Sequence, residues 1–314
     1  MKTKQIFIPL IAIFIFSLTA CKKDTITDPG PTPNATLSSD SNYLSKILFI
    51  EKNGNTIDTF IRSFNFDNQK RVITVQDYSL NPTVYEELTN FSYNSNDSLP
   101  FKRINISIAL NGKRDTSISF LFYNLNGILI KDSAIAYNHI SFNSQTVYTI
   151  LKGIKNYTYS PNKVFGNSVF SIIYDLSGTQ NPSTEKDTLT LDVNKDVISR
   201  KSKTVYSGNS TSILEFNGIY TYDTKPSHCR ALNINNIFPI VYEGADVIYN
   251  QQGAKNTRLK STETFYQNGN SSGTNIFDYT NKYSYKANGF PASVLMPYPP
   301  STDYSKLVFI YTTL

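Results

Sequence analysis

From Tyr43 onward, apolar and polar positions alternate in short runs that end in a recurring polar turn. Each unit has apolar side chains at positions i and i+2, which lie on one face of a strand. Asn, Asp or Gly follows and supplies the backbone geometry of a tight turn. The unit recurs at 64–69, 91–96, 121–127, 157–162, 189–194, 220–225, 247–253 and 283–289.

The recurrence has a regular spacing. Its first and last anchors, Phe66 and Tyr285, are 219 residues apart over seven intervals, so the mean period is about 31 residues. Near the midpoints lies a second set of turn signals: Asn53-Gly54, Asn81-Pro82, Asn111-Gly112, Ser177-Gly178, Gly208-Asn209 and Asn268-Gly269. The two sets leave strands of roughly 8 to 12 residues. Outside the first 20 residues, no segment has helical periodicity.

This pattern predicts an all-β fold. We expect a large up-and-down antiparallel meander of about 16–18 strands, curled or closed on itself, because twisted sheets that wide seldom stay open. A membrane-spanning barrel is the alternative, and it needs an apolar outer band. Strict alternation places Arg258 and Lys260 on one face and Glu263 on the other, and it places Arg62 on the face of Phe64. Charges on both faces favour a sheet that does not span the membrane.

The start of the chain predicts a lipid anchor. Lys2 and Lys4 precede an apolar stretch over 6–18, and a small residue, Ala20, stands directly before Cys21. This is the layout of a secretory signal with a lipoprotein cleavage site. The sequence predicts cleavage before Cys21 and acylation of its thiol. The apolar run is too short for a spanning helix, which needs roughly 20 residues.

Residues 22–42 are rich in small polar residues and proline, a composition that favours a flexible tether; an ordered edge segment is the alternative. The chain therefore divides into a signal peptide (1–20), a lipidated cysteine with its tether (21–42) and a repetitive β domain (43–314). We expect the protein in the cell envelope, anchored to the outer membrane on either of its faces.

Composition agrees with this division. The 22 Tyr and 20 Phe suit strands, and charged residues make up only 17% of the chain. Once Cys21 is acylated, Cys229 is the one remaining cysteine, so an intramolecular disulfide is excluded. The net charge of +6 is spread along the chain. No basic run interleaves with aromatic residues, so the sequence predicts no nucleic-acid partner.

Candidate chemistry is sparse. His139 and His228 are the only histidines, and adjacent residues such as His228-Cys229 or Glu86-Glu87 point to opposite faces of a strand. No phosphate-binding, calcium-loop or nucleophile-elbow spacing occurs. We therefore predict no catalytic residues, no metal and no cofactor. Carboxylates from distant segments could still form a glycosidase pair.

Four hydroxyl residues follow Asp and precede a small or aliphatic residue: Thr25, Ser98, Ser133 and Thr188. This arrangement resembles the O-glycosylation acceptor signal of the Bacteroidota. Turn formation is the alternative explanation, because Asp and Ser both favour turns.

The repeats also resemble a known family. Tyr220-Thr221-Tyr222-Asp223 and the turn at 286–291 are similar to the YD repeats of RHS-type proteins, and Lys22-Lys23-Asp24 after the lipidation site resembles uncharacterised lipoproteins of the Bacteroidota. The resemblance covers about 43–314. Most copies lack the arginine and second glycine of a YD repeat, and Leu191 replaces one aromatic residue. It implies a β-rich exported domain and no known activity.

These observations predict a non-catalytic binding module for a glycan or protein ligand, held to the lipid bilayer through Cys21. An envelope scaffold without a small ligand is the alternative, and a glycan hydrolase is a third hypothesis. Tyrosines precede equivalent turns in the repeats, and we expect them to stack in register as structural residues: Tyr93, Tyr123, Tyr159, Tyr222 and Tyr285.

Overall fold

The computed structural model describes residues 42–80, 86–95, 97–108, 112–142, 145–174, 180–194, 196–207, 211–228, 256–297 and 302–313. Within these ranges, the regular structure is one antiparallel sheet of 17 strands. None of these residues belongs to a helix long and apolar enough to cross a membrane.

The strands follow one another along the chain. They are β1 (Asn42–Asn53), β2 (Thr56–Phe66), β3 (Val72–Ser79), β4 (Glu86–Tyr93), β5 (Pro100–Ile108), β6 (Arg114–Tyr123), β7 (Leu129–Phe142), β8 (Gln145–Ser160), β9 (Lys163–Tyr174), β10 (Gln180–Leu191), β11 (Val197–Tyr206), β12 (Ser212–Pro226), β13 (Asn256–Gln267), β14 (Asn270–Asp278), β15 (Tyr283–Tyr285), β16 (Pro291–Pro297) and β17 (Tyr304–Thr313).

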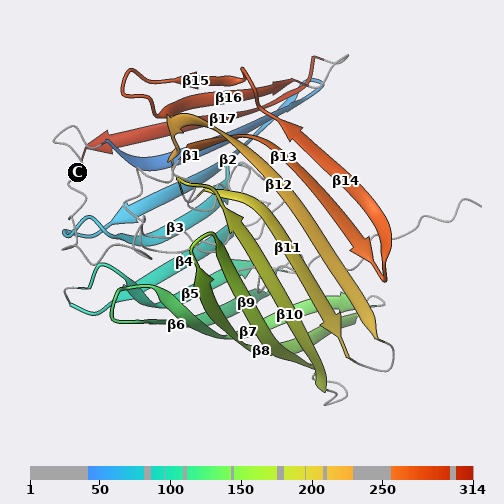
Figure 1. Ribbon diagram of the computed structural model, residues 1–314. Helices are drawn as coiled ribbons and strands as arrows, with labels where there is room; N and C mark the ends of the chain where they lie inside the picture. Colours follow the sequence, from blue (N-terminus) through green and yellow to red (C-terminus); the bar gives the residue numbers. More distant parts are fainter. Residues whose placement is uncertain are drawn as a thin grey trace, which may run out of the picture.

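Each strand from β1 to β13 pairs antiparallel with the next one along the chain. Strand β1 also pairs with β17, β17 with β16, and β16 with β15. The first and last strands therefore lie side by side, and the sheet curls round an interior (Figure 1). The predicted up-and-down meander is confirmed, and the strand number lies within the expected range.

The curl is interrupted between β14 and β15. Over the described residues the pairing register ends with β13–β14 on one side and β15–β16 on the other, so the sheet is not closed there. Aromatic rings pack around this junction: Tyr279 is buried, stacks on Phe277 with ring centroids 6.4 Å apart, and meets Tyr283 edge-on at 6.4 Å. Aromatic side chains therefore pack together where the backbone pairing between neighbouring strands ends.

The recurring polar turn has one geometry in several copies. At Asp67, Asn124 and Lys286, the N–H of the first turn residue donates to the carbonyl four residues later. The carbonyl of the same residue accepts from the N–H three residues later. The fourth residue has a positive φ: 62° at Lys70, 70° at Gly127 and 85° at Gly289. The sequence unit therefore encodes a defined turn.

The second set of turns is described in part. Asn268 and Gly269 have φ angles of 51° and 82°, and Gln267 pairs with Asn270 across them. This is the geometry of a two-residue hairpin. Gly54 and Gly112 also have positive φ. The turns expected at 81–82, 177–178 and 208–209 lie outside the described residues.

A register shift accompanies most copies of the unit. It falls directly before the last aromatic residue, as at Ser92/Tyr93, Phe122/Tyr123 and Thr221/Tyr222. The last of these overturns one expectation. Leu259 is the extra residue opposite that shift, so Arg258 turns inward and is 5% exposed, while Lys260 stays outside. Strict alternation was wrong there because it does not allow for a bulge.

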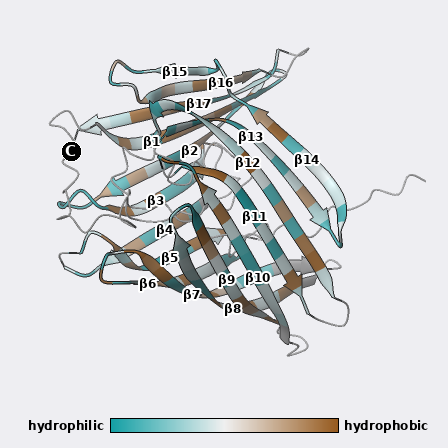
Figure 2. Ribbon diagram, in the orientation of Figure 1, coloured by the Kyte–Doolittle hydropathy of each residue, from teal (hydrophilic) through white to brown (hydrophobic). Residues whose placement is uncertain are grey.

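Hydrophobic and hydrophilic residues are interspersed along the strands (Figure 2), and the buried residues include both apolar clusters and charges. The largest cluster joins β1–β4 to β14–β17: Leu44, Ile47, Phe64, Val72, Val75, Phe91, Tyr279, Val294, Leu307 and Phe309. Two smaller ones lie on β6–β11: Leu121, Leu129, Tyr157, Val164, Leu189, Leu191 and Val197, and Ala134, Ala136, Leu151, Phe170 and Ile172. Between them lie the charged residues described next.

Candidate functional site

A buried charge cluster occupies the inner face of β7–β11. It consists of Asp132, Lys155, Glu185, Asp187 and Arg200. The pairing register brings them together, since Asp132 stands opposite Lys155, and Ser168 of β9 stands between Lys155 and Glu185. Lys155, Asp132, Glu185 and Asp187 are each no more than 4% exposed.

Lys155 is the centre of the buried charge cluster. Its Nζ donates to Glu185 Oε1 at 2.9 Å and also to Asp187 Oδ2. To reach β10, the lysine passes over Gly166 of β9, where a Cβ atom would lie 2.6 Å from Lys155 Cε. Any larger residue at 166 would displace the lysine. Arg200 completes the arrangement, because its Nε and Nη2 each lie 3.2 Å from Asp187 Oδ1.

The charges of the cluster act on one another. Burial disfavours the charged form of Lys155, but Asp187 and Glu185 more than offset this and raise its pKa. Burial would raise the pKa of Asp187, yet the adjacent Arg200 and Lys155 hold it below its ordinary value. Burial dominates at Glu185 and raises its pKa to about 7. Asp187 is therefore the carboxylate that the two cations stabilise.

Asp132 differs from the other two carboxylates. Its two oxygens have no hydrogen-bond partner among the described residues, and the residue is 1% exposed. Burial raises its pKa to about 6, although Arg103 and Lys155 attract its charge. A buried carboxylate without hydrogen bonds is destabilising when ionised.

We therefore expect Asp132→Asn to stabilise the fold at pH 8. Because the folded-state pKa of about 6 lies above the ordinary value of 3.8, the favourable contribution of Asp132 is complete below about pH 4. It is lost as the pH rises through 6. Asparagine keeps the shape without the charge, so the gain at pH 8 should be roughly 2–3 kcal/mol. Urea unfolding at pH 4 and pH 8 measures it.

Asp58→Asn is the matched control, since Asp58 is an exposed carboxylate on β2. As a surface substitution, it should change the free energy of unfolding by about 0.5 kcal/mol or less. If Asp132→Asn were less stable than the wild type at pH 8, the carboxylate would have a stabilising partner.

A second polar group lies on the inner face of β2–β6. Arg62 binds Asp77 through two bonds, Nε to Oδ1 at 2.7 Å and Nη2 to Oδ2 at 2.5 Å. On β5, Asn105 donates to Glu87 and to Thr89. These groups satisfy one another across neighbouring strands. Among the described residues, no three His, Cys, Asp or Glu side chains form a group that could hold a metal ion.

One end of the sheet carries a ring of tyrosine hydroxyls, which we call the tyrosine rim. It includes the turns at 67–71, 94–99, 124–128 and 286–290. Each of five tyrosines in the last third of a strand donates its hydroxyl to the carbonyl of the residue that begins the preceding strand. The pairs are Tyr93 to Val72 (2.7 Å), Tyr123 to Pro100 (2.9 Å), Tyr159 to Leu129 (2.6 Å), Tyr222 to Val197 (2.8 Å) and Tyr311 to Pro291 (2.9 Å).

Four of the five tyrosines singled out by the repeat belong to this set. Tyr285 differs, because its hydroxyl donates to Asp223 Oδ2 at 2.5 Å instead. Tyr311 makes the repeated bond although the sequence unit does not identify it. Each tyrosine thus ties one repeat to the one before it.

The predicted site residues are spread over the fold. Cys21, Thr25 and Cys229 lie outside the described residues. Ser98 is exposed in the turn between β4 and β5, whereas Ser133 and Thr188 are half-buried within β7 and β10. Their glycosylation remains a prediction, and the structure does not bring these hydroxyls together.

The two histidines also lie apart. His139 on β7 contacts Asp115 Oδ1 at 2.8 Å. His228 is buried against Phe309 with ring centroids 4.8 Å apart, and burial lowers its pKa to about 3, with further lowering by Arg62 and Arg258. His228 is therefore a neutral core residue at neutral pH.

The buried charge cluster was not predicted from the sequence. One signal was available: Glu185 and Asp187 are two residues apart in a strand and so share a face. The same face carries Leu189 and Leu191, which marks it as internal. The partner lysine comes from a strand 30 residues earlier. Only the pairing of β8 with β9 and of β9 with β10 brings this lysine next to the two carboxylates.

Comparisons with known proteins give limited results. No family model matches the sequence, and no curated protein matches it. Two similar solved structures are porin-like proteins from Bacteroides vulgatus and Bacteroides uniformis. The first is 13% identical with a TM-score of 0.47, over 87% of this chain and 100% of that one. The second is 14% identical with a TM-score of 0.39, over 86% of this chain and 98% of that one.

Proposed function

We propose that this chain is a lipid-anchored, non-catalytic envelope protein that binds its partner through its outer surface. The observation that carries this proposal is the burial of its strongest candidate for acid–base chemistry. Glu185 and Asp187 are neighbours on one strand face, as a glycosidase pair would require, but each is 4% exposed and bound by Lys155. A general acid must come within hydrogen-bond reach of a substrate.

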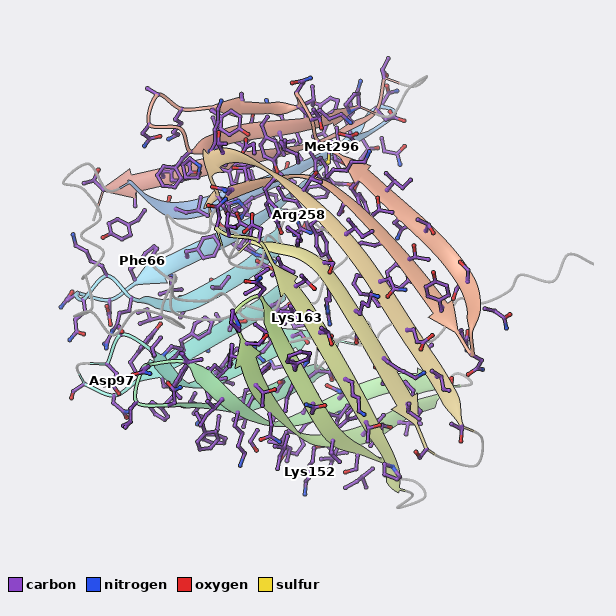
Figure 3. The ribbon with its side chains drawn as sticks, viewed as in Figure 1. Phe66, Asp97, Lys152, Lys163, Arg258 and Met296 are labelled. Atoms are coloured by element: carbon purple, nitrogen blue, oxygen red, sulfur yellow. The ribbon has the colours of Figure 1, made fainter. Side chains whose placement is uncertain are left out.

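The side chains that a ligand can reach lie on the outer face of the sheet. On β10 and β11, Lys186, Lys201 and Lys203 are exposed. Figure 3 shows Lys152 projecting from the outer side of β8, away from the interior. A glycan or protein ligand would therefore meet these side chains rather than the buried charge cluster. This supports binding over catalysis.

The anchor is tested by Cys21→Ser in the native host. Without the thiol there is no acceptor for the lipid, so the variant should accumulate as an uncleaved or soluble precursor. Each buried methylene of an acyl chain contributes about 0.8 kcal/mol to membrane attachment, so its loss should release the protein from the membrane fraction. Labelled fatty acid and membrane fractionation give the two readouts.

Ser17→Ala, within the signal but before the cleavage site, is the matched control and should be labelled normally. Equal incorporation of fatty acid in Cys21→Ser and the wild type would refute the lipoprotein assignment. An enzyme would be revealed separately, by turnover of envelope glycans that Glu185→Gln abolishes without unfolding the protein.

A further inference from the structure

We propose that one sector of the tyrosine rim docks onto an anionic lipid surface. The sector, which we call the rim patch, lies on β5–β7. It consists of five apolar side chains and two lysines: Phe101, Phe120, Phe122, Leu125, Ile130, Lys102 and Lys131. The proposal rests on the lipid anchor of the proposed function and adds the part of the fold that meets the membrane.

The apolar side chains of the rim patch are unusually exposed to solvent. Leu125, at the tip of the β6–β7 turn, is 107% exposed, and Phe122 is 45% exposed. Phe101, Phe120 and Ile130 are each 37–41% exposed. The inward neighbours of Phe120, Ser119 and Leu121, are buried. Aromatic and aliphatic side chains on a solvated turn are suited to the boundary between headgroups and acyl chains.

The charge of the rim patch is of one sign. Lys102 lies over the ring of Phe120 at 5.7 Å, and Lys131 over the ring of Phe122 at 5.1 Å. The two carboxylates of β5–β7 do not share this surface, since Asp132 is buried and Asp115 is held by His139. Lysine beside an apolar ring can place its stem in the interface and its ammonium among phosphates. This combination matches an anionic bilayer.

The first strand of the sheet begins at the same end as the rim patch. Strand β1 begins at Asn42 beside the end of β2, where Tyr43 meets Phe66 edge-on at 5.5 Å. Figure 3 places Phe66 and Asp97 at this end. Gln69 and Arg71 of the β2–β3 turn bond to the carbonyls of Ser95 and Asp97 in the next turn. The turn after that carries Leu125.

The lipid anchor is close enough to hold this end at the bilayer. Cys21 precedes Asn42 by 21 residues. A flexible chain of that length has a root-mean-square end-to-end distance of about 25 Å. Acylation would therefore bring the tyrosine rim, rather than the hairpin end at Gly54, toward the membrane. The two apolar tips of the rim would then touch it first: Leu125 and Val193, which is 92% exposed.

A tryptophan reporter tests this docking in the full lipidated protein. The chain has no Trp, so Leu125→Trp supplies a single fluorophore. In vesicles of equal parts phosphatidylglycerol and phosphatidylcholine, we expect a blue-shifted emission and quenching by brominated lipid. Ile57→Trp is the matched control, because Ile57 is 59% exposed at the opposite end of the sheet and should stay quenchable by aqueous iodide.

The contribution of the two lysines to docking is tested in the same Leu125→Trp variant. Lys102→Gln with Lys131→Gln should reduce the ratio of docked to undocked protein by about five-fold per lysine, or roughly 25-fold for the pair. Lys186→Gln with Lys201→Gln, on the exposed outer face of β10 and β11, should leave it unchanged. Vesicles of phosphatidylcholine alone should give the same loss as the first pair.

Three outcomes would overturn the proposal. Emission from Leu125→Trp could match that of the Ile57→Trp control in anionic vesicles. The reporter could be shielded from brominated lipid and iodide alike, which would indicate a second copy of the chain. Docking could be insensitive to the lysines and to lipid charge. Each of these would leave the lipid anchor intact, since fatty-acid labelling of Cys21 measures it independently.

Discussion

Replacing Lys155 with methionine should destabilise the fold by about 3–5 kcal/mol, the range found when one partner of a buried ion pair is removed. Lys155 has no exposed surface and donates to both Glu185 and Asp187. Methionine fills a similar volume but leaves these carboxylates facing Arg200 alone. The melting temperature should fall by on the order of 10 °C, measured by circular dichroism at pH 8.

The same variant should recover part of its stability at low pH. Without the lysine, Glu185 keeps the desolvation that already raises its pKa to about 7, and it loses an attraction that lowers it. Protonation of Glu185 then removes an uncompensated buried charge. The difference between Lys155→Met and the wild type should therefore shrink between pH 8 and pH 5.

Lys152→Met is the matched control, because Lys152 lies three residues earlier on β8 and is exposed on the outer face. Surface substitutions of this kind change stability by about 0.5 kcal/mol or less. If Lys155→Met unfolded no more readily than Lys152→Met, the buried charge cluster would not hold β8 to β10, and the interior would have to be hydrated.

The architecture could be predicted from the sequence because each repeat contains the residues that determine its own strand and its own turn. Alternation at positions such as Leu121 and Tyr123 specifies a strand. Asn124 and Gly127 then specify the turn, whose bonds involve only residues 124–128. These are local relations, so a single sequence reveals them. The up-and-down order follows, since short turns join antiparallel neighbours.

What the sequence did not predict depends on register. Arg258 was predicted to share a face with Lys260 because alternation was extended through Leu259, and a single bulged residue reverses the faces on one side of it. Lys155 and Glu185 are 30 residues apart, and β9 lies between their strands. The pairing on both sides of β9 must be known before that contact can be identified. The buried charge cluster is therefore a product of tertiary structure.

Replacing Tyr222 with alanine should lower the free energy of unfolding by about 3–5 kcal/mol, the range for truncating a buried aromatic side chain. Tyr222 lies at the register shift between β12 and β13, and its hydroxyl donates to Val197 at the start of β11. Burial raises the pKa of its phenol. The substitution removes both the packing and the bond that ties two repeats, so the melting temperature should fall by on the order of 10 °C.

Tyr222→Phe separates these two contributions. It keeps the ring and leaves the Val197 carbonyl without its donor, so the loss should be about 1–2 kcal/mol. Tyr266→Ala, on the outer face of β13, is the matched control and should cost less than either. An unchanged melting temperature for Tyr222→Ala together with lost ligand binding would reverse the interpretation. The tyrosine rim would then be a recognition surface, and the hydroxyls that bind carbonyls within the fold would be available to a partner.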